Sequence, residues 1–189
     1  MRLGAKKGEY GYISAMKVKT ALITLAIFLC AISVYILGLY FFREQKTMVG
    51  IVTVLICIPA SMALVRFIMF MRFKEGDPHL KDMIDERRGA VPVFYDSIIT
   101  TSDKSYPVNA FIAASGNLIG CTLYEGIDVK KLEEHIKEIF RLNKYKDLNI
   151  KVFTDRNKFF ERLDALSSHY EKASDTDRNI LHLVGRISL

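Results

Sequence analysis

Two long uncharged runs of mainly apolar residues dominate the N-terminal part of the chain. Residues 20–42 and 47–65 contain no charged side chain, and only the four polar residues 43–46 separate them. At a rise of about 1.5 Å per residue, the runs span roughly 34 and 28 Å as helices, which is close to the thickness of a hydrocarbon core, about 30 Å. The predicted segments are a polar N-terminal tail (1–16) and a transmembrane helical hairpin (17–73) with helices at about 18–42 and 47–71.

The rest of the chain, residues 79–189, alternates β-rich runs with helical stripes. Runs of β-branched and aromatic residues predict strands, and apolar residues spaced by three and four predict helices. After a short helix at 80–88, the predicted strands are residues 91–101, 108–114, 118–124, 148–154 and 180–187, with helices that begin at the N-caps Asp128 and Asp155. The predicted fold class is an α+β (mixed α/β) soluble domain with the order β-β-β-α-β-α-β, preceded by the hairpin.

Two local signals set limits on this assignment. Pro107 has no N–H to donate to a central ladder, so the second strand is expected to begin after it. The polar residues 174–177 predict a loop before the last strand.

The net charge of +6 lies on and beside the predicted hairpin. Residues 1–78 hold 10 Lys or Arg against 4 Asp or Glu, whereas residues 79–189 hold 17 of each. A neutral C-terminal domain argues against a nucleic-acid-binding surface. The expected partners are therefore the lipid bilayer and a protein partner or a second copy of the chain, with no nucleic acid.

Basic residues lie before the first helix and after the second, whereas the loop that connects the two helices has only Arg43 and Lys46. Lys and Arg favour the cytoplasmic side, so we expect an integral membrane protein with both termini cytoplasmic. The residues expected to contact lipid are Lys17, Lys19, Arg66, Arg72 and Lys74. Arg66 is either an anchor at the helix end or part of an ion path or lipid site.

Metal and cofactor sites lack their usual signals. Cys30, Cys57 and Cys121 are scattered and form neither a disulfide framework nor a CxxC pair, and no two of the four histidines share a ligand spacing. We therefore expect no metal and no cofactor.

Glu125 and Asp155 are the candidate catalytic residues, though each has a plain structural explanation. If the third and fourth strands are parallel, both acids lie at carboxyl ends of strands, where open α/β sheets place ligands. The element order also overlaps with the core of restriction-type nucleases, but that core needs acids and a lysine on its second and third strands to hold a metal. Asn109 and residues 119–123 supply none of them.

These observations favour a membrane-anchored cytoplasmic module, non-catalytic, that binds a protein partner or a small ligand at the inner membrane face. One alternative is a hydrolase-like or other enzyme with its acids at the strand ends. Another is a small subunit of a larger membrane complex, such as a transporter.

Overall fold

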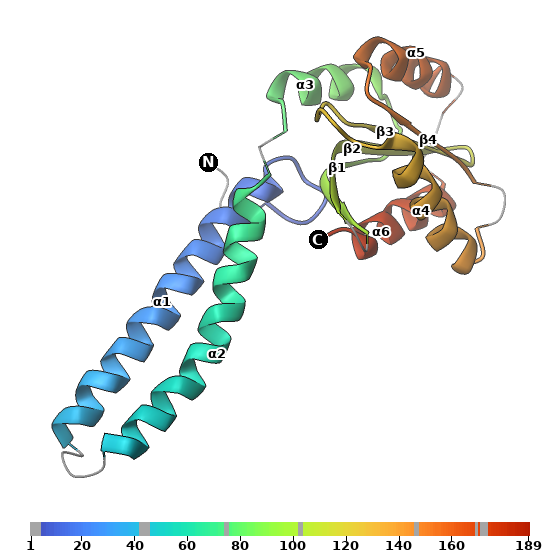
Figure 1. Cartoon of the computed structure of the whole chain (residues 1–189). Coiled ribbons are helices and arrows are strands. Elements are labelled where there is room, and N and C mark those ends of the chain that lie inside the picture. Colours follow the sequence, from blue (N-terminus) through green and yellow to red (C-terminus); the bar gives the residue numbers. More distant parts are fainter. Residues whose placement is uncertain are drawn as a thin grey trace. The chain divides into compact units, whose positions relative to one another are not determined.

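The chain forms two compact units, a helical hairpin and a mixed α/β domain, shown in Figure 1. The hairpin unit covers residues 13–73, and the domain covers residues 76–189 together with residues 5–12. The computed structural model describes residues 5–41, 46–73, 76–101, 104–145, 148–168, 170 and 174–189.

The hairpin consists of α1 (Tyr12–Phe41) and α2 (Lys46–Met71). Both helices are apolar on all sides, and both are long and apolar enough to span a membrane. Near the connecting loop the two helices approach closely at Gly38, where an added Cβ would lie 2.5 Å from Cγ1 of Val49. A side chain at position 38 would therefore force the helices apart.

The domain is built on one four-stranded sheet, in the order β1 (Val93–Thr100), β2 (Ser105–Ala114), β3 (Asn117–Cys121) and β4 (Asn149–Phe153). The first two pairs of strands are antiparallel and the third, β3 with β4, is parallel. The chain passes from β3 to β4 through a helix. Their parallel pairing is the arrangement that the sequence predicts for such a crossover.

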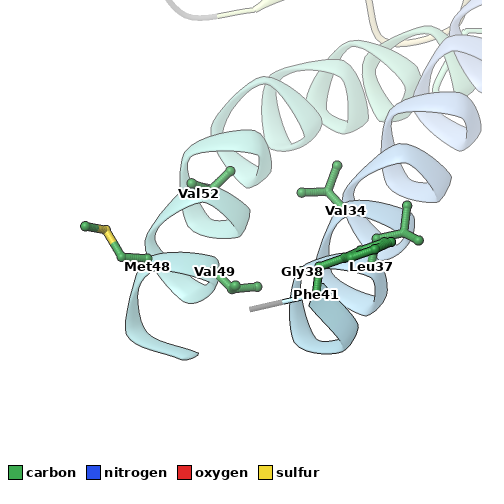
Figure 2. Close-up of a pocket in the computed structure, with 7 residues that line it drawn as sticks. All are labelled: Val34, Leu37, Gly38, Phe41, Met48, Val49 and Val52. Carbon is green, nitrogen blue, oxygen red and sulfur yellow. The ribbon is translucent and has the colours of Figure 1, made fainter. Parts of the chain in front are cut away.

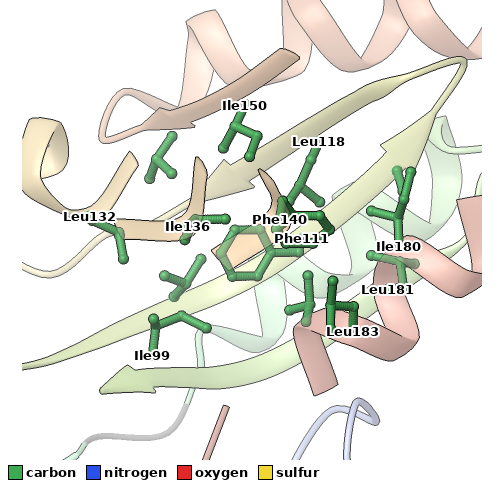
Figure 3. Packing of buried hydrophobic residues seen from close by; sticks show 14 of the residues in the cluster. Ile99, Phe111, Leu118, Leu132, Ile136, Phe140, Ile150, Ile180, Leu181 and Leu183 are labelled. Atoms are coloured by element: carbon green, nitrogen blue, oxygen red, sulfur yellow. The ribbon is translucent and has the colours of Figure 1, made fainter. Parts of the chain in front are cut away.

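Helices cover both faces of the sheet (Figure 1). The helices α4 (Val129–Leu142) and α6 (Asp175–Ile187) pack on one face, and α3 (Pro78–Arg87) and α5 (Arg156–Ser167) lie on the other. Figure 3 shows the first of the two resulting cores, in which Phe111 and Phe140 are fully buried. The second core is centred on Ile84, Ile112 and Phe159. The fold is thus a three-layer arrangement of mixed α and β elements.

The two residues predicted as N-caps, Asp128 and Asp155, cap the helices that follow them. Asp128 accepts a hydrogen bond from the Lys131 amide at 3.3 Å, and Asp155 accepts one from the Asn157 amide at 2.9 Å. Each carboxylate satisfies an N–H group that has no partner within its own helix.

The last element corrects the predicted order, because residues 180–187 are helical and not a strand. Ser174 caps this helix by accepting from the Thr176 amide, and Asp177 lies in its first turn. Ile180 and Val184, which are four apart, are both buried on one face. The only strand-like contact near the end of the described chain is a bridge between Ile99 and Ser188.

The second strand begins earlier than predicted and contains Pro107. At this level β2 pairs only with β1, where Pro107 is opposite Ile98, because the ladder with β3 begins at Ala110. Pro107 is therefore locally in an edge position, where a missing N–H costs no ladder hydrogen bond.

Candidate functional site

The side chains of β2 change faces of the sheet at Asn109. Val108 and Phe111 belong to the same core although they are three residues apart, whereas a regular strand places every second residue on one face. The neighbouring residue on β1, Asp96, has a φ of +49°, which is unusual for a residue other than glycine. Irregularities of this kind re-aim side chains and often occur at functional positions.

Asp96 is almost fully buried, with 4% of its surface exposed, and it holds the chain on both sides of the hairpin. Its Oδ2 accepts a hydrogen bond from the amide of Gly11 at 2.6 Å. Its Oδ1 lies so close to Gly76 that an added Cβ there would be 2.6 Å away. The residues that precede α1 and those that follow α2 therefore meet at one carboxylate.

Residues 5–12, which we call the N-terminal strap, are bonded to the domain along β1. The Tyr95 amide donates to the Gly8 carbonyl at 2.9 Å, and the Tyr10 hydroxyl donates to the Gly76 carbonyl at 2.8 Å. Lys7 Nζ donates to the Ser188 carbonyl at 2.6 Å, and burial lowers the pKa of this lysine. The strap therefore differs from the loose tail expected over residues 1–16.

Glycine is required where the strap passes beside β1. Gly8 has a φ of +93°, and a Cβ at this position would lie 2.6 Å from the ring of Phe94. Gly11, which donates to Asp96, has a φ of +87°. Side chains at either position would strain the backbone, and at Gly8 one would also collide with the ring.

The polar side chains near Asp96 form hydrogen bonds with backbone groups of the same domain. The Asn109 carbonyl oxygen accepts from the Leu123 amide at 2.8 Å, and the Thr122 hydroxyl donates to the Pro107 carbonyl at 2.9 Å. Burial, with a smaller contribution from the charge of Asp96, raises the pKa of Tyr124 to about 12. These groups fix the chain where it leaves β3.

The cavity at this cluster is small. It encloses about 10 Å³, and its lining includes Tyr10, Lys81, Tyr95, Asp96 and Asn109. Such a volume has room for about one water molecule and for no organic ligand.

A second group of charges adjoins this cavity on α3. Asp85 accepts a hydrogen bond from the Tyr95 hydroxyl at 2.9 Å, and Lys81 Nζ lies 2.8 Å from its other oxygen. Burial alone would raise the pKa of Asp85, but these two bonds and the positive charges of Arg88 and Lys81 outweigh it and lower the pKa. The bond to Asp85 in turn raises the pKa of Lys81. This group joins α3 to β1.

Glu125 and Asp155 follow the carboxyl ends of the parallel strands β3 and β4, but both are exposed. The carboxylate of Asp155 is engaged as the N-cap of α5. Among the described residues, no group of three His, Cys, Asp or Glu could hold a metal ion. A catalytic role for the two acids stays a prediction.

Cys121 lies on β3 and is completely buried. Burial raises the pKa of its thiol to about 12, so the reactive thiolate is scarce at neutral pH. This residue is a packing side chain of the second core.

Two grooves lie between the helices in the described part of the hairpin. The first, shown in Figure 2, encloses about 400 Å³ near the connecting loop, and its described lining consists of apolar residues and Gly38. The second encloses about 470 Å³ toward the other end, and its lining includes Lys19 and Arg66. Of the other residues expected to contact lipid, Lys17 is half-buried and Arg72 is exposed, whereas Lys74 is outside the described residues.

The sequence analysis pointed to acids that follow the carboxyl ends of two strands but missed Asp96, which lies within β1. An available signal was the position of this acid within the otherwise uncharged run 91–101. A carboxylate in the middle of a buried strand needs a partner, and the strap amide is that partner.

No protein-family model matches this chain, and the comparisons with curated proteins and with solved structures give no match either.

Replacement of Asp96 by Asn tests its hold on the strap. Asn tolerates a positive φ and keeps an acceptor oxygen, so the change removes mainly the charge. Because hydrogen bonds to charged groups are stronger by about 1 kcal/mol, we expect amide exchange in residues 5–12 to rise roughly fivefold. Hydrogen exchange with mass spectrometry measures this on the full chain. The exposed Glu161→Gln variant is the control, and equal exchange in both variants would contradict the assignment.

The Lys81–Asp85 pair predicts a pH dependence of stability. The folded pKa of Asp85 is lowered, so its contribution is present above about pH 4 and is lost as the pH falls through that folded value. The folded pKa of Lys81 is raised, so its contribution is fully present below about pH 10, the ordinary pKa of lysine, and is lost as the pH rises through the higher folded pKa. Asp85→Asn should therefore reduce the free energy of unfolding by about 1 kcal/mol at pH 7 and by less at pH 3.

Chemical denaturation of the full chain in detergent, followed by the near-ultraviolet signal of its tyrosines, measures this difference. Asp82→Asn removes a carboxylate whose side chain is 71% exposed and serves as the control. An Asp85→Asn effect of the same size at both pH values would contradict the prediction.

Proposed function

We propose that the protein is a membrane-anchored module whose C-terminal domain lies in the cytoplasm and binds a protein partner or a small ligand, without catalysis. The observation that carries the proposal is the bonding of the N-terminal strap to β1. The strap precedes α1 and β1 follows α2, so both lie on the same side of any membrane that the helices cross. This arrangement supports two crossings by the two long apolar helices.

Charge supports the cytoplasmic side. Lys17 and Lys19 lie near the start of α1, and Arg66 and Arg72 lie near the end of α2, on the side of the strap and the domain. An excess of Lys and Arg favours the cytoplasmic face.

The hydrogen bonds and the small cavity near the carboxyl ends of the strands support the proposal that the protein is non-catalytic. Open α/β sheets place ligands at the carboxyl ends of their strands. Just beyond the end of β3, the Thr122 hydroxyl bonds to the Pro107 carbonyl and the Leu123 amide bonds to Asn109, and the cavity lined by Asp96 and Asn109 has room for about one water. A substrate would have to replace the Gly11 amide of the strap to bind the Asp96 carboxylate.

The edges of the sheet leave little room for a partner to add a strand. The outer edge of β1 is engaged with Gly8 and with the amide of Leu189. On β4, which has only five residues, the Val152 amide donates to a carboxylate oxygen of Glu133 at 2.7 Å. Short and blocked edges disfavour strand addition, so side-chain surfaces of the domain are the expected contact.

The second candidate is an enzyme, favoured by the position of Glu125 and Asp155 beyond the ends of two parallel strands. A substrate could reach both carboxylates because both residues are exposed.

Labelling of single cysteines tests the topology in a background without the three native cysteines. We expect a cysteine at Gln45 to react with a membrane-impermeant maleimide in intact cells, and one at the exposed Glu161 to react only after permeabilisation. The chain should also stay in the membrane at high pH in carbonate. Reaction of the Glu161 cysteine in intact cells would reverse the orientation, and release by carbonate would exclude an integral protein.

Complementation of a cell that lacks the chain separates the two candidate functions. The double variant Glu125→Gln, Asp155→Ser removes both carboxylates, and Ser preserves an N-cap on α5. We expect full complementation by this variant and none by a chain that ends at residue 73. Loss of complementation by the double variant, with normal membrane levels and normal folding, would favour the enzyme.

A further inference from the structure

One of the two hairpin grooves combines an apolar wall with two positive charges. It lies between α1 and α2 and encloses about 470 Å³, a volume within the range of sites for small molecules. Lys19 on α1 and Arg66 on α2 both line it. The side chains of both residues are exposed.

The lining residues have a clear order along the helices. Lys19, Ile23 and Ile27 are four apart, so they lie on one face of α1 in a line that runs away from the strap. On α2, Met62 and Ala63 line the same groove on the loop side of Arg66. The groove therefore has its two cations toward the first turns of α1 and the last turns of α2, and aliphatic side chains toward the middle of the hairpin.

These two charges have no acidic partner within the part of the hairpin that the structure describes. Among the described residues of 13–73 there is no Asp or Glu, and neither Lys19 nor Arg66 forms an ion pair there. The Thr20 hydroxyl beside them donates to the Met16 carbonyl at 2.7 Å. A ligand that neutralises the two cations must therefore bring its own negative charge.

We infer that this groove binds one anionic phospholipid of the cytoplasmic leaflet, with the phosphate between Lys19 and Arg66 and an acyl chain along Ile23, Ile27 and Met62. This inference rests on the proposed membrane insertion. A free phosphate would neutralise the cations but would leave the apolar wall uncovered. A phospholipid has both a negatively charged headgroup and apolar acyl chains, and in a bilayer the acyl chains extend from the headgroup toward the membrane centre. Basic pockets between membrane helices on the cytoplasmic side are suited to anionic headgroups.

The apolar groove near the loop provides an internal contrast. The lining that the structure describes includes Val34, Phe41 and Val49 and carries no charge, so these residues offer nothing that distinguishes one lipid headgroup from another (Figure 2). Selectivity for an anionic lipid is therefore expected from the groove at Lys19 and Arg66 alone.

Retention of phosphatidylglycerol over phosphatidylcholine by the full chain tests the inference, measured by native mass spectrometry from mixed micelles. The double variant Lys19→Gln, Arg66→Gln should lower the preference for phosphatidylglycerol about 30-fold, because each basic residue near an anionic surface contributes about a factor of five. The matched control is Lys17→Gln, Arg72→Gln, which makes the same charge change at residues that do not line the groove. The control should lower the preference less than fivefold.

A second pair of variants tests the apolar half of the groove without a change of charge. Ala63→Phe places a ring in the groove and should also abolish the preference. Val65→Phe, at a residue that is 63% exposed, should leave it unchanged. Circular dichroism and size-exclusion chromatography of each variant confirm that the hairpin is intact.

The outcomes are distinct. An equal loss in the two charge variants would show general attraction to an anionic surface and would overturn the site. Normal lipid preference in Ala63→Phe, or a stable dimer that covers the groove in place of lipid, would also overturn it. Extraction of the wild-type chain by carbonate would instead contradict membrane insertion itself, so the two failures can be told apart.

Discussion

The hydrogen bond from the Gly11 amide to the buried carboxylate of Asp96 ties the N-terminal strap to the middle of β1. A carboxylate inside a sheet is costly unless it is paired, and the strap amide offsets part of this cost. The same bond fixes the strap along β1, and the glycines at positions 8 and 11 are needed for this path. The residues on either side of the hairpin are thereby tied to one strand.

This constraint uses the part of the sheet where a ligand would ordinarily bind. Asn109 and Thr122, which lie beside Asp96, hold the exit of β3 and the start of β2. The polar cluster therefore joins segments of the domain to one another through hydrogen bonds within the chain.

The sequence predicted much of this fold because its signals were local. Period, caps and turns identified the two long helices, the first four strands of the domain and the helices that follow Asp128 and Asp155. The misassigned last element had local helix signals too, namely Ser174 before two acids and buried residues four apart, but its density of Ile, Leu and Val resembled a strand. Pro107 was misjudged because whether a strand is central depends on where its neighbour ends.

Asp96 could not be placed from the sequence because its partner is far away along the chain. The bond joins residues 85 positions apart, and the hairpin lies between them. Closure of so long a segment is unfavourable in a free chain, but a helical pair brings its two ends together in advance. During synthesis the strap emerges before β1 exists, so the sheet edge can be completed only after both helices have been made. The bonds between the strap and β1 are thus among the contacts of the domain that can form only late in synthesis.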